Sequence, residues 1–366
     1  GDYPAALEKC QEALGLCRQL GDRAAEATTL SFMGTIYKTL GDYAQALSYY
    51  QQALSIFQAL GDRLNEATTL NNIGLVYQAT ADYLQALASF KQALAIFRDL
   101  GEEKWEGIIL SNFGSVYHAL QDDRQALVYY EEALAIFRRI DNPGWKGLTL
   151  SNMGIAYEAL GEYEQALSCF QEAVPAFREA GNRQGEANAL YQIGWVHDLQ
   201  GDYDQALTYY LQSLPILREL GDKAGEALTL SVIASAYQSQ EKLDQALLYR
   251  QQALALWREI GDRGNEAIEL DSIAHIYESR GSFQQALAYF QQALPIWQEL
   301  GDRREEARTL TDIGRLRVEG SVERRGVRLR ADLTKAYLAD LLVLVSGADH
   351  GIHGRRWWEA RSEGQK

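Results

Sequence analysis

Side-chain amides recur at a spacing of forty residues in the middle of the chain. Asn72, Asn112 and Asn152 share one position of this spacing, and Gln192 occupies the next. An amide carries both a donor and an acceptor, so a row of amides can bond successive peptide units of an extended strand without reading its side chains. This column therefore indicates recognition of a peptide backbone. The alternative is a set of solvated polar positions copied by repeat duplication.

Titratable side chains give little indication of catalysis. His118 and His275 have no carboxylate or nucleophile at a spacing that favours acid–base chemistry, and His197 takes a packing position. His350 and His353 stand between glycines without further ligands, which is a weak metal signal. We therefore expect no enzyme, no metal site and no cofactor.

The amides must be positioned by a repeated helical unit. Glycines recur at forty-residue spacing without an insertion, at Gly21, Gly61, Gly101, Gly181, Gly221, Gly261 and Gly301. Within one copy, residues 61–100, apolar and small residues follow helical periodicity in two runs. Each copy is therefore predicted to be a pair of amphipathic helices, and the chain to be an array of such pairs.

We name the first helix of each pair A and the second B. The pattern predicts A helices near 22–39, 62–79, 102–119, 142–159, 182–199, 222–239, 262–279 and 302–317. It predicts B helices near 3–19, 43–59, 83–99, 123–139, 163–179, 203–219, 243–259 and 283–299. Gly61 is suited to close a B helix in the left-handed conformation, and Asp62 to cap the following A helix. Arg63 and Glu66, three residues apart, are expected to form a weak surface pair.

The repeat resembles the tetratricopeptide repeat. The resemblance is carried by Leu70, Ile73, Gly74 and Tyr77, followed by Ala86, Phe90 and Ala93, and it extends over residues 1–318. The forty-residue length is closest to the repeats of kinesin light chain, of the Pins/LGN adaptors and of bacterial arrays, although the usual closing proline is missing. The resemblance implies an all-α, right-handed superhelical solenoid of antiparallel helix pairs. Gly154, at an expected helix crossing, should not tolerate leucine.

In tetratricopeptide folds the A helices line the concave face, which holds an extended peptide or a partner helix. The resemblance places Asn71 and Gln78 on this face beside the amide column, and Asn72, Asn112 and Asn152 match the asparagine ladder of O-GlcNAc transferase. Phe32, Val232, Ser272 and Asp312 depart from that ladder.

Other groove-facing candidates are aromatic or charged. Tyr191 and Trp195 lie four residues apart on one A helix, and they suit either an interface anchor or additional core packing. His118, Glu158 and Asp198 project toward the same groove. The carboxylates suit a basic partner segment, although such charges more often form a solvated face.

Composition limits the partners. The formal net charge of −15 disfavours nucleic acid and anionic membranes, which are bound through positive surface. A protein or peptide of neutral or basic character is the expected partner. Cys10, Cys17 and Cys169 are too few and irregular for a disulfide framework, which favours a cytoplasmic location. No run reaches the ~20 apolar residues of a membrane span.

The sequence divides into an array over residues 1–318, a C-terminal capping helix over 319–345 and a flexible tail over 346–366. The array begins in the middle of a repeat, so the chain is expected to be a fragment of something longer. We interpret it as a protein-interaction scaffold. Two alternatives stay open: the sensor or regulatory arm of a multidomain signalling protein, and an array that self-associates through an unfinished end.

Overall fold

The computed structural model describes the backbone of residues 2–325 and the side chains of residues 2–318. This range contains sixteen α-helices and no strand. The A helices are α2 (Arg23–Thr39), α4 (Arg63–Ala79), α6 (Glu103–Ala119), α8 (Pro143–Ala159), α10 (Arg183–Leu199), α12 (Lys223–Ser239), α14 (Arg263–Ser279) and α16 (Arg303–Arg325). The B helices are α1 (Tyr3–Leu20), α3 (Tyr43–Leu60), α5 (Tyr83–Leu100), α7 (Asp123–Arg139), α9 (Tyr163–Glu179), α11 (Tyr203–Leu220), α13 (Leu243–Ile260) and α15 (Phe283–Leu300). The predicted all-α class and its helix pairs are confirmed.

The turns between helices have the predicted chemistry. Gly61 ends α3 with a φ of 70°, and the carboxylate of Asp62 accepts a hydrogen bond from the backbone N–H of Asn65 at 3.2 Å. Some turns from an A helix to a B helix lack glycine, and there Ala81, Gln121 and Glu241 themselves adopt positive φ. The turn is thus retained even where its glycine is lost.

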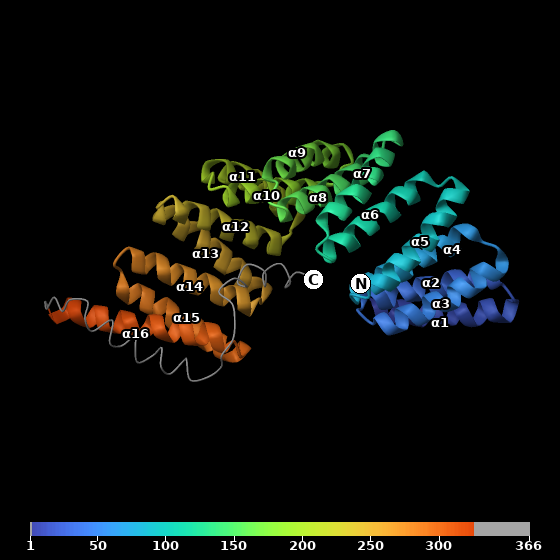
Figure 1. Cartoon of the computed structure of the whole chain (residues 1–366). Helices are drawn as coiled ribbons and strands as arrows, with labels where there is room; N and C mark the ends of the chain where they lie inside the picture. The colour runs from blue at the N-terminus through green and yellow to red at the C-terminus, as the bar shows by residue number, and fades with distance from the viewer. Residues whose placement is uncertain (1, 326–366) are drawn as a thin grey trace. The chain divides into compact units, whose positions relative to one another are not determined.

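The chain divides into two compact units, Gly1–Ile260 and Gly261–Lys366. In the first unit, which contains α1–α13, each helix packs against the next along the chain. Successive A helices, from α2 to α10, also contact one another directly, so they form a continuous layer (Figure 1). In the second unit, α14 packs on α15 and α15 on α16. Both units are therefore solenoids of helix pairs.

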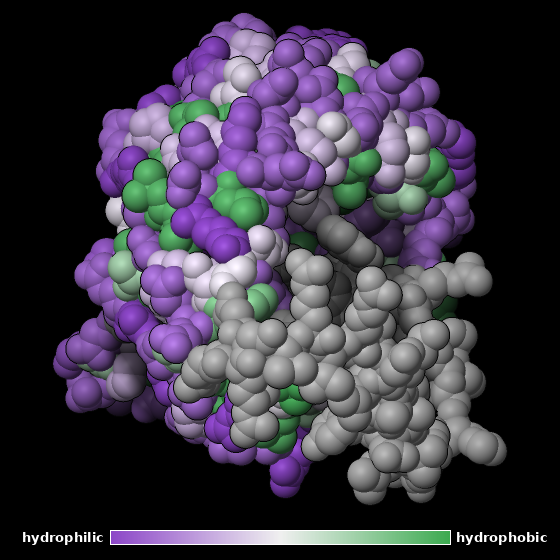
Figure 2. Space-filling model, turned by 90° about the vertical axis from the view of Figure 1, so that its left-hand side faces the viewer, coloured by the Kyte–Doolittle hydropathy of each residue, from purple (hydrophilic) through white to green (hydrophobic). Residues whose placement is uncertain are grey.

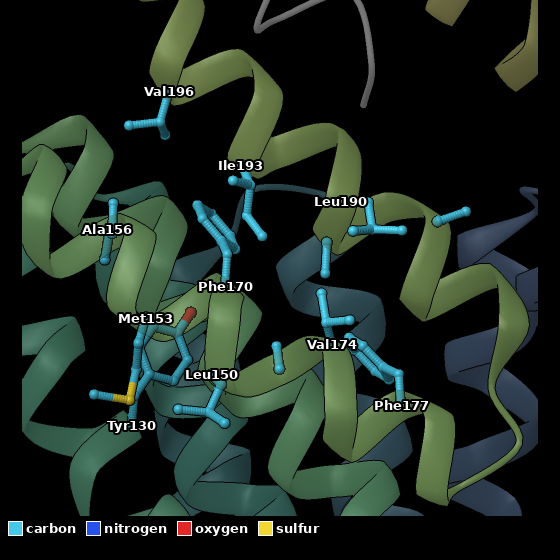
Figure 3. Packing of buried hydrophobic residues seen from close by; sticks show 14 of the residues in the cluster. Tyr130, Leu150, Met153, Ala156, Phe170, Val174, Phe177, Leu190, Ile193 and Val196 are labelled. Carbon is cyan, nitrogen blue, oxygen red and sulfur yellow. The ribbon is translucent and has the colours of Figure 1, made fainter. Parts of the chain in front are cut away.

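The core is rebuilt in every repeat from the same positions. Phe170 of α9 is fully buried, and it packs among Leu150 and Met153 of α8 and Ile193 of α10 (Figure 3). Its equivalents in most other repeats are aromatic and also buried: Tyr50, Phe90, Tyr130, Tyr210 and Phe290. Each of these rings fills the space between an A helix, its own B helix and the next A helix. Neighbouring repeats consequently share one core, as in other repeat proteins.

The small residues lie where the sequence predicts close helix contact. A Cβ atom added to Gly154 would lie 2.6 Å from the Phe170 ring, and one added to Gly34 would lie 2.8 Å from the Tyr50 ring. Real Cβ atoms do not approach neighbours so closely, so glycine is required here to seat the ring. The glycine thus makes room for the aromatic ring of the B helix and not for the backbone of that helix.

The expectation of a surface pair between Arg63 and Glu66 is wrong for the glutamate, which is only 8% exposed. Glu26, Glu186 and Glu266, at the same repeat position, are also buried. Glu186 is only 2% exposed, and its carboxylate accepts hydrogen bonds from Arg183 on its own helix and from Arg178 of α9. Glu26 is bound in the same way by Arg18 and Arg23. The glutamate is buried because the end of the preceding B helix covers it. An arginine eight residues earlier thus ties α1, α5, α9 and α11 to the next A helix. In α3 and α15 a glutamine, Gln58 or Gln298, takes this place.

Helix α16 continues to Arg325, past Arg317, where the repeat pattern ends. Residues 319–325, predicted to begin a separate capping helix, are therefore the last turns of α16. The remainder of that prediction and the tail at 346–366 lie outside the described residues, as do His350 and His353. Among the helices that the structure describes, none combines the length and apolarity needed to cross a membrane. Figure 2 shows one face, on which hydrophobic residues appear as separate spots in a hydrophilic surface.

Candidate functional site

The amide column lies along four consecutive A helices of the first unit. Asn72, Asn112, Asn152 and Gln192 come from α4, α6, α8 and α10, and each is partly exposed. Because these helices contact one another in order, the amides form a row across the A-helix layer. We call the surface formed by these amides and the neighbouring side chains of α4, α6, α8 and α10 the A-helix face. The row ends at Phe32 on one side, which is 56% exposed, and at the buried Val232 on the other.

One amide of the row is engaged within the protein. The Nδ2 of Asn112 donates a hydrogen bond to Oδ1 of Asn71 at 2.8 Å, which joins α6 to α4. Asn71 is only 5% exposed, so we assign it to contact between A helices and not to direct ligand contact. A similar link joins α6 to α8, where the hydroxyls of Ser111 and Thr149 are 3.2 Å apart. The row is thus held in place by polar contacts beneath it.

The two aromatic candidates lie on α10 and contact different neighbours. The indole Nε1 of Trp195 donates a hydrogen bond to Oε1 of Glu158 on α8 at 2.9 Å. The ring of Tyr191 is tilted by 46° against the ring of Tyr210 on α11, with 5.4 Å between the centroids. Both candidates are only partly buried. The structure therefore brings Tyr191, Trp195 and Glu158 together on the A-helix face.

The charged candidates form a second row beside the amides. Gln78, His118, Glu158 and Asp198 occupy one repeat position on α4, α6, α8 and α10, and all are partly buried. Burial raises the pKa of Glu158, and it raises the pKa of Asp198 as well. His118 lies close enough to act electrostatically on Glu158, but its Nδ1 is 2.5 Å from Oδ1 of Asp123. Across residues 2–318, no arginine or lysine forms an ion pair with Glu158 or Asp198.

The equivalent position on α14, in the second unit, is occupied by Glu278, which has a guanidinium partner. Glu278 is bound by Arg315, which also donates to Asp312 at 2.8 Å, and Nδ1 of His275 is 3.3 Å from Glu278. Asp271 accepts a hydrogen bond from Nε1 of Trp297 at 2.8 Å, and burial raises its pKa to about 6. Glu278 thus differs from Glu158 and Asp198 in having a guanidinium partner, whereas Asp271 resembles Glu158, since both accept an indole N–H.

A pairing between columns escaped the sequence analysis. Thr35 and Tyr50 have hydroxyls 3.0 Å apart, and the Tyr130 hydroxyl donates to Ser115 at 3.2 Å. Thr35, Ser115 and Trp195 occupy one repeat position, so Tyr210 finds an indole where the other tyrosines find a hydroxyl. The Tyr210 side chain is 0% exposed, and its hydroxyl has no hydrogen-bond partner. Comparison of these two columns in the sequence would have revealed the mismatch.

Metal chemistry has no support in the described part of the chain. No group of three or more histidine, cysteine, aspartate or glutamate side chains could hold a metal ion there. Cys10, Cys17 and Cys169 are free thiols, and burial raises the pKa of Cys169 to about 11. The arrangement on the A-helix face is instead one of hydrogen-bonding amides, aromatic rings and carboxylates, which suits binding.

Comparisons with known proteins agree with this architecture. A tetratricopeptide repeat family model matches residues 1–59, 65–139, 146–219, 199–259, 225–299 and 266–320. The matches cover most of the sequence, and the chain therefore belongs to the tetratricopeptide repeat family. A search of curated proteins found no match.

Similar solved structures share the fold at low sequence identity. A signal-transduction ATPase with a tetratricopeptide repeat sensor, from Pyrococcus horikoshii, is 15% identical with a TM-score of 0.66; the match covers 88% of this chain and 48% of that one. BtubC from P. vanneervenii is 19% identical with a TM-score of 0.54, covering 60% of this chain and 92% of that one. A Rap protein complexed with competence and sporulation factor is 17% identical with a TM-score of 0.52, and the match covers 76% of this chain and 77% of that one. At these identities the likeness shows the fold alone.

Proposed function

We propose that the chain is a protein-interaction scaffold that holds an extended peptide segment along its A-helix face. Repeat arrays present extended surfaces of this kind to their partners. The observation that carries the proposal is the row formed by Asn72, Asn112, Asn152 and Gln192 on four contacting A helices. Its amides offer both donors and acceptors to a peptide backbone. A neighbour of the same fold, the Rap protein, was solved with competence and sporulation factor bound.

The partial exposure of the row suits this role. A fully buried amide could not reach a ligand, and a fully exposed one would be well solvated and mobile. Asn112 shows an intermediate arrangement, since its Nδ2 is bonded to Asn71 while no hydrogen bond to its Oδ1 occurs among the described residues. The Asn71 contact fixes the orientation of the Asn112 amide before a ligand arrives. Such preorganisation reduces the entropy lost on binding.

The proposal is tested by replacing Asn72, Asn112 and Asn152 together with alanine. A random twelve-residue peptide pool, displayed on phage, is first selected on the unchanged chain, and a selected peptide is then titrated into both proteins. We expect binding to weaken by at least ~1 kcal/mol, the scale of a lost net hydrogen bond. Far-UV circular dichroism should be unchanged.

A matched control replaces three exposed amides on B helices, Gln51, Gln171 and Gln251, with alanine. This variant should bind as the unchanged chain does. If the Asn72, Asn112 and Asn152 variant binds as tightly as the unchanged chain, the amide row is not the binding element. If both variants weaken binding equally, the peptide does not bind the A-helix face in preference to the B helices.

A second candidate function is the sensor arm of a larger signalling protein. It is favoured by the likeness to the repeat sensor of the signal-transduction ATPase, although this likeness concerns the fold. Sequencing the gene on both sides of this segment separates the two candidates. An ATPase or another effector domain in the same reading frame would support the sensor role, and its absence would leave the free-standing scaffold.

A further inference from the structure

The first and last helices of the array are opposite halves of the same helix pair. An A helix packs against its own B helix seven times in the chain: α2 on α3, α4 on α5, α6 on α7, α8 on α9, α10 on α11, α12 on α13 and α14 on α15. Helix α1 is a B helix with no A helix before it among the described residues, and α16 is an A helix with no B helix after it in residues 2–325. Each of the two helices therefore has a face that is covered in every other repeat.

On α16 the face that should meet a B helix carries Ala307, Leu310 and Gly314. Leu310 is 47% exposed, whereas the leucine at this position of every other A helix is at most 5% exposed. Gly314 has nothing within 4 Å of an added Cβ, whereas at Gly34 and Gly74 a B-helix ring lies within 2.8 Å. No side chain of residues 2–318 therefore fills the seat that the other A helices offer to a B-helix ring.

On α1 the face that should meet an A helix carries residues 6, 10 and 13. At these positions the other B helices have buried side chains, whereas those of α1 are partly exposed: Ala6, Cys10 and Ala13. Leu16 is 58% exposed, although Ile56 at the same position is 5% exposed in a cluster with Leu14 of the preceding B helix. Helix α1 thus lacks the cover that a preceding helix pair gives to the other B helices.

A pocket of about 280 Å³ lies between the start of α1 and the end of α2, and its lining includes Tyr3, Ala6, Phe32, Thr35 and Ile36. In later repeats the position of Thr35 meets the preceding A helix, since Trp195 bonds Glu158 and Arg315 bonds Glu278. The residue of α16 at the position of Glu158 and Glu278 is Val318, which is 53% exposed. Phe32 is 56% exposed in a column that is otherwise mainly polar. The apolar exceptions at the two ends therefore match each other.

We propose that α16 of one copy of the chain packs on α1 of a second copy, as an A helix packs on its own B helix. The internal pairs supply the register, in which Gly314 faces Cys10 and Val318 enters the pocket beside Phe32. Helix α15 of the first copy then covers Leu16 of the second. Because the two surfaces differ, the contact is heterologous, and copies associate head to tail without closing at a dimer. The inference is independent of the peptide proposal, since neither helix carries a residue of the amide row.

Electrostatic repulsion opposes this contact. Arg317 and Lys9 take the positions of Tyr37 and Tyr49, whose rings stack with 5.3 Å between their centroids. Two cations therefore face each other where other repeats stack aromatic rings, and the net charge of −15 also disfavours association. Salt screens both repulsions. Association should consequently become stronger as salt is added, whereas an interface held by ion pairs would become weaker.

The test is sedimentation velocity of the full chain at increasing concentration, with circular dichroism to confirm that each variant is folded. Leu16→Glu blocks the α1 end, Leu310→Glu blocks the α16 end, and Leu84→Glu on α5 is the control, since Leu84 is 81% exposed. The mass of the unchanged chain and of the control should rise with concentration, while each end variant alone stays monomeric. An equimolar mixture of the two end variants should form dimers and nothing larger, because each supplies the intact end that the other lacks.

Each other occupant of these faces predicts a different result, and each result overturns the proposal. Association of Leu310→Glu alone would show that α1 pairs with another α1. An unchanged chain that stays monomeric at every concentration and salt would show that no second copy binds, as when residues 326–366 of the same chain cover α16. Equal loss of association in Leu84→Glu would show that added charge alone separates the copies.

Disulfide trapping tests the register of the contact. In the internal pair of α2 and α3, Cγ of Tyr50 is 3.1 Å from a Cβ built on Gly34. A disulfide places Cβ of one cysteine about 3 Å from Sγ of the other, so cysteines at these two positions can be joined. Gly314→Cys should therefore crosslink to Cys10 of a second copy under copper–phenanthroline oxidation and give a ladder of multimers on a non-reducing gel.

Two control variants make the crosslink specific, and Cys17→Ala is present throughout to leave one thiol on α1. Adding Cys10→Ala to Gly314→Cys should abolish every species larger than a dimer. Arg304→Cys, at an exposed position of the same helix, should give no ladder. An internally crosslinked monomer would place α16 on α1 of its own chain, and an equal ladder from Arg304→Cys would show random collision; either result overturns the proposed contact.

Discussion

The ring of Phe170 lies directly over the Cα atom of Gly154, where an added Cβ would be 2.6 Å from two of its carbons, Cε1 and Cζ. Phe170 is 0% exposed and packs among residues from three helices, so its ring has no free space into which it could move. The same contact joins Gly74 to Phe90 and Gly194 to Tyr210. Close seating of a B-helix ring on an A-helix glycine is thus a repeated feature of the fold.

Gly154→Ala should therefore destabilise the chain by about 1 to 3 kcal/mol, the usual range for overpacking, and leucine should cost more. Urea unfolding followed by circular dichroism measures the change. Gly314→Ala is the matched control, because Gly314 has the same repeat position but nothing within 4 Å of its added Cβ. There alanine should be neutral or stabilise by about 0.5 to 1 kcal/mol through helix propensity. Equal effects at the two sites would contradict the contact.

Tyrosine hydroxyls at one repeat position should respond differently to removal. Tyr130→Phe removes a hydrogen bond to Ser115 and should cost about 0.5 to 1.5 kcal/mol. Tyr210→Phe removes a hydroxyl that is buried without a partner, so it should be neutral or stabilising by up to about 1 kcal/mol. Thermal unfolding of both variants provides the measurement. A larger loss at Tyr210 than at Tyr130 would show that the Tyr210 hydroxyl is bonded in solution.

Much of the fold could be predicted from the sequence because the residues that begin and end each helix recur in successive repeats. Helix α4 was expected at 62–79 and is observed at Arg63–Ala79, since Asp62 and the apolar spacing fix its start and its buried face. The position of the amide row followed from the same register. These features depend on the residues of a single helix, and hydrophobic periodicity identifies the buried and exposed faces of a single helix.

Contacts between helices were harder to predict. The burial of Glu186 depends on Arg178 and on the end of α9, and the burial of Asn71 depends on Asn112 of the next A helix. The link from Trp195 to Glu158 spans thirty-seven positions in the chain. A pattern within one helix does not say which polar side chain will meet another across the layer. The pairing of Thr35 with Tyr50 could nevertheless be inferred from the sequence, because the residues at these two repeat positions vary together.

Asp271 should make the stability of the second unit depend on pH. Burial raises its pKa to about 6 despite hydrogen bonds from Trp297 and Thr309, with His275 and Glu305 also acting on it. Because the pKa is raised from an ordinary value of 3.8, the ionised form is disfavoured in the fold. The stabilisation from the protonated form is present below about pH 4 and is lost as pH rises through about 6.

Asp271→Asn should remove this dependence, since the amide oxygen can still accept from Trp297 while the side chain stays neutral. We expect the variant to be more stable than the unchanged chain by about 1 to 2 kcal/mol at pH 7, with little difference at pH 4. Thermal unfolding by circular dichroism at both pH values measures this, with the exposed Glu164→Gln as the control. A lower melting temperature for Asp271→Asn at pH 7 would show that Trp297 and Thr309 stabilise the ionised carboxylate more than burial disfavours it.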